Sequence, residues 1–174
     1  MPLLDEILDA NQKAVHSPGD KGSYVANRHL CIVTCVDPRL TRFFGFALGI
    51  ERGHAVAIRV PAAHIAPGSD VLRALAASIY VNDCQEVLVL PHTDCGAAKL
   101  TGSDVEAAMA RRGVPRESVE GPVDRFFGLV PDLRRATDET VRTIRDAPFL
   151  PRMPVHSALI DVATGSLTLW ERGY

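Results

Sequence analysis

HLCIVTC, the stretch from His29 to Cys35, decides the fold because it is apolar, rich in β-branched residues and too short for a helix. A continuous apolar run of this length is typical of a strand that is covered on both faces, as in a parallel sheet. Two similar runs follow, AVAI at residues 55–58 and EVLVL at residues 86–90. The three runs predict neighbouring strands of one sheet.

Helical patterns separate and follow these strands. In the segment 69–82 the apolar residues recur at helical spacing, and Ser69 or Asp70 is suited to cap its start. A helix that starts near Pro131 is also expected, because proline is favoured in the first turn. The helices predicted in chain order are 3–15, 69–82, 103–112 and 132–146.

The end of the chain predicts a hairpin of two strands, residues 155–162 and 166–170, joined by an Ala-Thr-Gly turn. Strands that alternate with helices are typical of an α/β fold with right-handed connections. We therefore expect a single domain over residues 1–174, with a mostly parallel β-sheet flanked by helices and the C-terminal hairpin at one edge.

Composition excludes several classes of protein. The 174 residues are enough to bury a core, and the formal net charge of −2 with scattered basic residues argues against a nucleic-acid surface. No segment approaches the roughly 20 apolar residues that span a bilayer, and the first residues carry acids where a signal peptide has basic residues. These features predict a cytoplasmic protein without a nucleic-acid or membrane partner. The four cysteines are then expected to be metal ligands or buried thiols.

Three side chains that suit zinc follow two of the predicted strands. Cys35 ends the first strand, and His92 and Cys95 come directly after the third. Ligands of open α/β sheets bind outside the carboxyl ends of the strands, so the three should meet there. Gly96 is expected to permit the unusual backbone conformation of this turn. Two thiolates and one imidazole leave the fourth position of a tetrahedral zinc vacant, as in catalytic sites.

Asp37 and Arg39 follow the first ligand in the sequence Cys-Val-Asp-Pro-Arg. The carboxylate can accept a hydrogen bond from a zinc-bound hydroxide, and the guanidinium can hold that carboxylate in place. Freed from the arginine, Asp37 could itself reach the metal and close the site. The alternative interpretation is a structural ion pair in a loop.

Cys-x-Asp-x-Arg after one strand and His-x-x-Cys-Gly after a later one resemble the β-class carbonic anhydrases, in particular their short bacterial branch. The similarity covers nearly the whole chain from the first strand onward and includes the turn from Asp161 to Gly165. It implies one Zn²⁺ per chain, the hydration of carbon dioxide to bicarbonate, and a homodimer or homotetramer. The family also includes enzymes that hydrolyse carbonyl sulfide or carbon disulfide with the same metal site.

The sequence departs from the family after Arg59, where the usual Asn-Ala-Gly is replaced by Val60-Pro61-Ala62-Ala63. Three functions stay open. The first is hydration of carbon dioxide by a zinc-bound hydroxide that Asp37 orients. The second is hydrolysis of carbonyl sulfide or carbon disulfide, which a narrower or more apolar channel would favour. The third is a homologue that binds zinc without catalysis, with a fourth ligand such as Asp37 on the metal.

Two further residues near the expected site have open roles. His64 lies in the altered loop and is a candidate proton shuttle, or else an exposed loop histidine. Asp94, between the ligands of the later motif, is either a hydrogen-bond acceptor behind the ligands or a turn residue.

Overall fold

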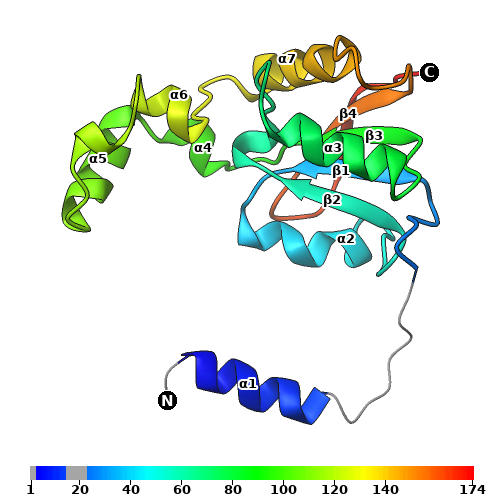
Figure 1. Cartoon of the computed structure of the whole chain (residues 1–174), viewed down its shortest axis with the longest axis horizontal. Helices are drawn as coiled ribbons and strands as arrows, with labels where there is room; N and C mark the ends of the chain where they lie inside the picture. Colours follow the sequence, from blue (N-terminus) through cyan, green and yellow to red (C-terminus); the bar gives the residue numbers. More distant parts are fainter. Residues whose placement is uncertain (1–2, 15–22) are drawn as a thin grey trace.

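The computed structural model describes residues 3–14 and 23–174, and its centre is a five-stranded sheet (Figure 1). The strands lie in the order β2-β1-β3-β4-β5; the first four run parallel, and β5 pairs antiparallel with β4. The predicted α/β fold, with a mostly parallel sheet and the hairpin at one edge, is confirmed. The strands are β1 Leu30–Thr34, β2 Ala55–Arg59, β3 Glu86–Leu90, β4 Val155–Ile160 and β5 Leu167–Glu171.

Helices lie on both faces of this sheet, with α3 and α7 on one side and α2 on the other (Figure 1). The predicted helices are present to within two residues, whereas the sequence patterns missed α2, α4, α6 and three short 3₁₀ turns. The helices are α1 Leu3–Ala14, α2 Phe43–Phe46, α3 Val71–Tyr80, α4 Gly96–Lys99, α5 Gly102–Arg111, α6 Val123–Phe127 and α7 Leu133–Arg145, and the 3₁₀ turns are η1 Pro38–Arg42, η2 Pro61–Ala63 and η3 Arg116–Ser118. Val15, the last residue of the first predicted helix, lies outside the described residues.

Two apolar clusters show why the strands are continuous hydrophobic runs. On one face, Leu75 of α3 and Ile144 of α7 pack with Val33 of β1. On the other face, Phe43 of α2 packs against a cluster that contains Ile32 of β1. β1 is therefore buried on both sides, as its lack of polar alternation predicts.

The starts of two predicted helices are set by particular side chains. The Ser69 hydroxyl accepts a hydrogen bond from the backbone N–H of Val71 at 3.2 Å, whereas no side-chain cap comes from Asp70. The expectation that Pro131 lies in the first turn of α7 is wrong. Asp132 follows it as the cap, and its carboxylate accepts the N–H of Arg135 at 3.0 Å, so the helix begins after the proline.

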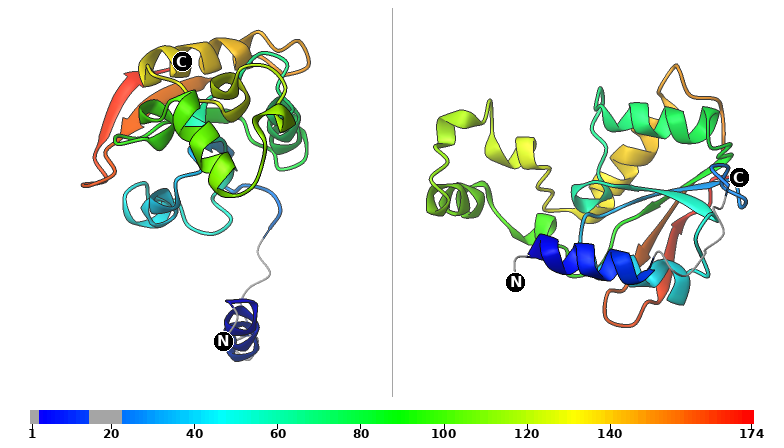
Figure 2. Two further views of the ribbon diagram at one scale, coloured as in Figure 1. Left: turned by 90° about the vertical axis from the view of Figure 1, so that its left-hand side faces the viewer. Right: turned by 60° about the horizontal axis from the view of Figure 1, so that its bottom comes forward.

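α1 stands apart from the sheet (Figure 1 and the left view of Figure 2). Residues 3–12 are exposed, including Leu4, Ile7 and Leu8 on its apolar side. A second projecting part runs from α4 through α5 to α6, and α5 contains no buried residue. Among the helices within residues 3–14 and 23–174, none is long and apolar enough to cross a membrane.

Candidate metal centre

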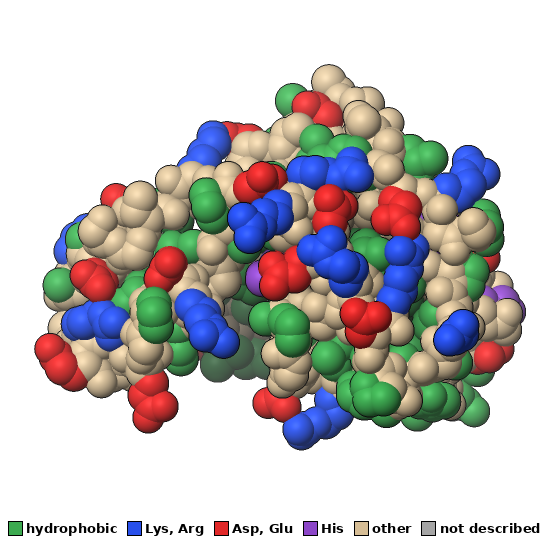
Figure 3. Space-filling model, turned by 90° about the horizontal axis from the view of Figure 1, so that it is seen from above, with side chains coloured by type: hydrophobic (Ala, Val, Ile, Leu, Met, Phe, Trp, Pro, Cys, Tyr) green, Lys and Arg blue, Asp and Glu red, His purple; other side chains and the backbone are tan. Residues whose placement is uncertain are grey.

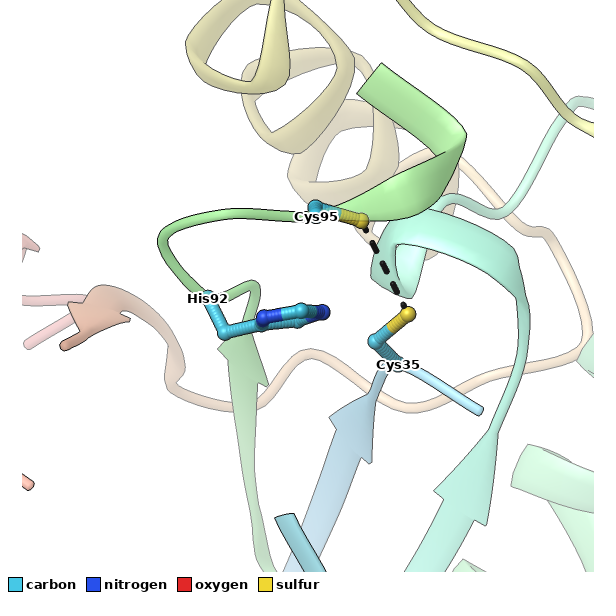
Figure 4. Close-up of side chains that lie close together, drawn as sticks. All are labelled: Cys35, His92 and Cys95. Atoms are coloured by element: carbon cyan, nitrogen blue, oxygen red, sulfur yellow. Dashed lines mark hydrogen bonds between the residues drawn. The ribbon is translucent and has the colours of Figure 1, made fainter. Parts of the chain in front are cut away.

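The carboxyl ends of β1 and β3 bring the three predicted ligands together. The two strands pair in parallel with Thr34 opposite Leu90, and the Thr34 hydroxyl donates a buried hydrogen bond of 2.7 Å to the Leu90 carbonyl. Cys35 leaves the sheet directly after Thr34, and the turn with the other two ligands leaves directly after Leu90. Figure 4 shows Cys35, His92 and Cys95 pointing toward one another from these adjacent strand ends.

The distances within this group fit a zinc ion. The Sγ atoms of Cys35 and Cys95 lie 3.8 Å apart, and the ligand atoms of all three side chains lie within 4.8 Å of one another. Tetrahedral zinc with Zn–S bonds of about 2.3 Å would hold two sulfurs about 3.8 Å apart. A disulfide would need about 2.05 Å, and all four cysteines are free. The donor set and the spacing therefore suit zinc better than a covalent bridge.

His92 is oriented so that one ring nitrogen is left for a metal. Its Nδ1 lies 2.7 Å from the Thr93 carbonyl oxygen, and in the tautomer that donates there Nε2 carries the free lone pair. The side chain is 0% exposed, and Nε2 finds no hydrogen-bond partner in the described part of the chain. A buried polar atom without a partner is costly, so this nitrogen is placed as a ligand atom would be.

Electrostatics favour one negative charge on the sulfurs even without a metal. The Cys95 thiol donates a hydrogen bond to Cys35, which lowers the pKa of Cys35 against the opposing effect of burial. That negative charge and burial raise the pKa of Cys95. Burial alone would lower the pKa of His92, but the nearby Cys35 raises it overall. Binding of both cysteines as thiolates therefore requires a cation between them.

The hairpin holds the turn that carries His92. The backbone N–H of Thr93 donates to the Ile160 carbonyl at 3.0 Å, and its hydroxyl accepts the N–H of Val162 at 2.9 Å. The Asp161 carboxylate in turn accepts the N–H of Thr164 at 2.8 Å. The C-terminal turn noted in the sequence thus positions the ligand turn.

Asp37 and Arg39 form a close ion pair beside the ligands. Arg39 donates from Nε to Asp37 Oδ1 at 2.9 Å and from Nη2 to Asp37 Oδ2 at 2.7 Å. This pairing lowers the pKa of Asp37 to about 2, so the carboxylate is charged at neutral pH. Its Oδ2 lies 3.7 Å from Nε2 of His92, which places the carboxylate next to the free lone pair.

Asp94, and not Gly96, has the unusual backbone conformation in the ligand turn. Asp94 has a φ of 57°, whereas Gly96 is the first residue of α4 and its φ is not positive. The expectation for Gly96 is therefore wrong. Asp94 also contacts both Arg39 and Lys99, and these contacts lower its pKa to about 2, with Lys99 the larger cause. The sequence patterns did not single out Lys99.

The turn after β2 lies against the same group of ligands. Ala62 and Ala63 both have a positive φ, 55° and 57°, and both are buried. Ala62 lies in the same buried cluster as Cys35, and its backbone helps to lower the pKa of that cysteine. This altered turn therefore packs against the candidate centre.

His64, two residues further on, faces a different space. Its ring lines an open cavity of ≈ 670 Å³ that α6 borders on the far side, and its Nε2 lies 3.6 Å from a carboxylate oxygen of Glu139. Among the described residues that line this cavity there is no ligand of the group. The space-filling view in Figure 3 shows a hollow with a histidine side chain beside an acidic one at its edge.

Known proteins resemble the chain over its full length, although no protein-family model matches it. It is 33% identical over 172 residues to beta-carbonic anhydrase 1 of Mycobacterium tuberculosis, which covers 96% of this chain and 97% of that protein. The crystal structure of beta-carbonic anhydrase isoform I from Trichomonas vaginalis is similar over 100% of both chains, with a TM-score of 0.88 and 31% identity. Carbon disulfide hydrolase of Acidianus sp. is 28% identical over 144 residues, which cover 72% of this chain and 69% of that protein.

Proposed function

The chain belongs to the β-carbonic anhydrase family, and we propose that it binds one zinc ion through Cys35, His92 and Cys95 to hydrate carbon dioxide to bicarbonate. The observation that carries this proposal is the convergence of two buried sulfurs and one buried imidazole, with 3.8 Å between the sulfurs. A bound zinc would lower the pKa of a water in its remaining position and so supply a nucleophile near neutral pH.

Asp37 would orient this nucleophile. As a charged carboxylate beside His92 Nε2, it can accept the nucleophile's O–H hydrogen bond, which leaves an oxygen lone pair directed at the carbon of carbon dioxide. Arg39 binds the same carboxylate through two nitrogens, which supports a fixed orientation. The pairing also supports catalysis over the non-catalytic alternative, because Asp37 is engaged by Arg39 and so is kept from acting as a fourth ligand.

His64 would carry the proton from the centre to solvent. Its open cavity, its neighbour Glu139 and its position two residues after Ala62 support this role. The route would have to pass the turn after β2, because none of the three ligands lines the cavity that His64 borders. In dilute buffer, His64→Ala should then hydrate carbon dioxide more slowly, and added imidazole should restore the rate. An unchanged rate in dilute buffer would exclude the role.

Carbon disulfide or carbonyl sulfide is the second candidate substrate. Two observations favour it: the similarity to carbon disulfide hydrolase, and the apolar Val60–Ala63 turn that touches Cys35. Both substrates are linear, small and apolar like carbon dioxide. An apolar wall would therefore admit them without a new polar contact.

We also propose that the chain self-associates, with at least two copies in the assembly. The apolar side of α1 is exposed, and an open groove of ≈ 380 Å³ on the sheet is lined in part by Leu88, Ala158 and Leu169. Exposed apolar surfaces of this kind are typical of interfaces between subunits. The molar mass by light scattering should exceed that of one chain and fall in the Ile7→Asp variant. A wild-type mass of one chain would refute the proposal.

One experiment separates the three functions. Zinc-loaded protein is assayed by stopped flow for carbon dioxide hydration, and its zinc content is measured on the same sample. The expected result is one zinc per chain and rapid hydration. Sulfide release from carbonyl sulfide or carbon disulfide with poor hydration would favour the second candidate. One zinc per chain with neither activity would leave the non-catalytic homologue, and no zinc would refute the metal centre.

A further inference from the structure

Arg39 forms hydrogen bonds with two acidic residues. Asp37 binds one side of its guanidinium, and Asp94 binds another side. Nη1 of Arg39 donates to Asp94 Oδ2 at 2.8 Å, and Nη2 donates to the Asp94 carbonyl at 3.0 Å. Asp37 receives hydrogen bonds from Nε and Nη2. Nη2 has two hydrogens, so the bonds to Asp94 do not remove those to Asp37. The two acids thus bind different edges of one planar group.

The backbone conformation of Asp94 lets both its carbonyl and its carboxylate accept hydrogen bonds from Arg39. With a φ of 57°, Asp94 turns its carbonyl and its carboxylate toward the same guanidinium. An L-residue other than glycine rarely adopts this conformation, although Asp tolerates it better than most. The other carboxylate oxygen, Oδ1, pairs with Nζ of Lys99 at the end of α4. Asp94 is therefore anchored on the side that faces away from Arg39.

We propose that Asp94, anchored by Lys99, is a positioning residue that fixes the guanidinium of Arg39 and thereby keeps Asp37 off the metal. This inference rests on the proposed metal centre. The Asp37 carboxylate lies 3.7 Å from His92 Nε2, so a small rotation would bring it to a metal bound there. A rigid Arg39 competes with that rotation, and a mobile Arg39 competes less well.

The test uses cobalt(II)-substituted protein and thiocyanate, whose binding at the remaining metal position changes the cobalt absorption. In Asp94→Gly the acceptor oxygens of the side chain are lost without backbone strain, and the thiocyanate dissociation constant should rise about fivefold. Asp94→Asn removes the same charge but keeps an oxygen acceptor and tolerates the positive φ, so it should stay within about twofold of wild type. Simple electrostatics predicts the opposite for Asp94→Gly, because loss of a negative charge should tighten anion binding.

Controls separate positioning from a merely structural role. Glu106→Gln removes a comparable exposed ion pair, that with Arg116, and should leave the dissociation constant unchanged. Cobalt content and melting temperature are measured on every variant. If Asp94→Gly binds cobalt poorly, Asp94→Ala replaces it, because alanine occupies this conformation at positions 62 and 63.

Two results would overturn the inference. The first is a thiocyanate dissociation constant in both Asp94→Gly and Asp94→Ala that is no higher than in wild type. The second is a dissociation constant in Asp94→Asn that rises as much as in Asp94→Gly, because loss of charge would then be the cause. Wild-type protein that takes up no cobalt would refute the inference and the metal centre together. Protein that binds cobalt and thiocyanate but does not hydrate carbon dioxide would refute only the proposed activity.

Discussion

The turn after β3, residues 91–96, and the turn after β2, residues 60–64, reach the same cluster of side chains in different ways. They follow the two strands that pair with β1 on either side, and both contain a residue other than glycine with a φ of 55–57°. In the first turn that residue is Asp94, whose side chain binds Arg39 and Lys99. In the second turn Ala62 and Ala63 have no polar side chain and are 1% and 0% exposed.

The difference shows two ways to maintain an uncommon backbone conformation. Each such residue costs about 1–2 kcal/mol for an ordinary L-side chain. At Asp94 the hydrogen bonds with Arg39 and Lys99 offset the cost, and the same bonds hold Arg39 beside the ligands. Ala62 and Ala63 have no polar side chain, so burial offsets the cost there, together with a backbone hydrogen bond from Ala63 to Val60. The turn after β3 is therefore organised for chemistry, and the turn after β2 is held by packing.

The largest expected effect lies in the turn after β3. Cys95→Ser replaces one of two sulfur ligands, so zinc affinity should fall at least about 100-fold and hydration should fall to background. Cys84→Ser is the matched control, a buried cysteine outside the ligand group, and should keep one zinc per chain. If Cys95→Ser kept its zinc and its activity, the turn after β3 would not be organised for chemistry.

A bulky residue in the turn after β2 should lower the stability of the protein. Ala62→Val places a β-branched side chain at a buried position with positive φ, which should cost about 3 kcal/mol of the free energy of unfolding. The melting temperature should then fall by about 6–12 °C. Ala66→Val, at an exposed alanine of the following loop, should change the free energy by at most about 0.5 kcal/mol. Equal effects of the two changes would contradict the account of packing.

Glycine should stabilise the turn after β2 but not the turn after β3. Ala62→Gly or Ala63→Gly relieves strain and should raise the free energy of unfolding by about 0.5–1 kcal/mol, after the entropy of the unfolded chain is included. Asp94→Gly relieves the same strain but loses its bonds to Arg39 and Lys99, so it should not stabilise. Urea unfolding of metal-free protein measures all three. A stabilised Asp94→Gly would show that its contacts contribute little.

The smallest effect is a difference in pH dependence. The pKa of Asp94 is about 2 in the folded protein against an ordinary 3.8, so its contribution to stability is present above about pH 4 and is lost as the pH falls toward 2. The stability difference between wild type and Asp94→Asn should therefore shrink over that range in metal-free protein. The difference between wild type and Ala63→Gly should stay constant, because no acid is changed. Parallel pH curves for both pairs would argue against the ion pairs of Asp94.

Local sequence patterns predicted the strands and the three candidate ligands because both depend on short-range order. A buried strand must be apolar along its length, and residues just beyond parallel strands meet at one edge. The same reasoning missed Lys99, which reaches Asp94 from the end of a four-residue helix without a helical pattern of its own. It also assigned the unusual backbone to Gly96, because glycine tolerates such geometry, although Asp94 adopts it here.

The amino-acid sequence by itself determined the α/β order of elements, the identity of the candidate ligands and the dyad of Asp37 with Arg39. Only the tertiary structure decided where His64 points, which acid binds the second edge of Arg39, and how two alanines remain in a left-handed turn. The physical reason is that periodicity and ligand chemistry are properties of residue types along a chain. Side-chain direction and the balance of strain against packing depend on neighbours that folding brings from distant segments.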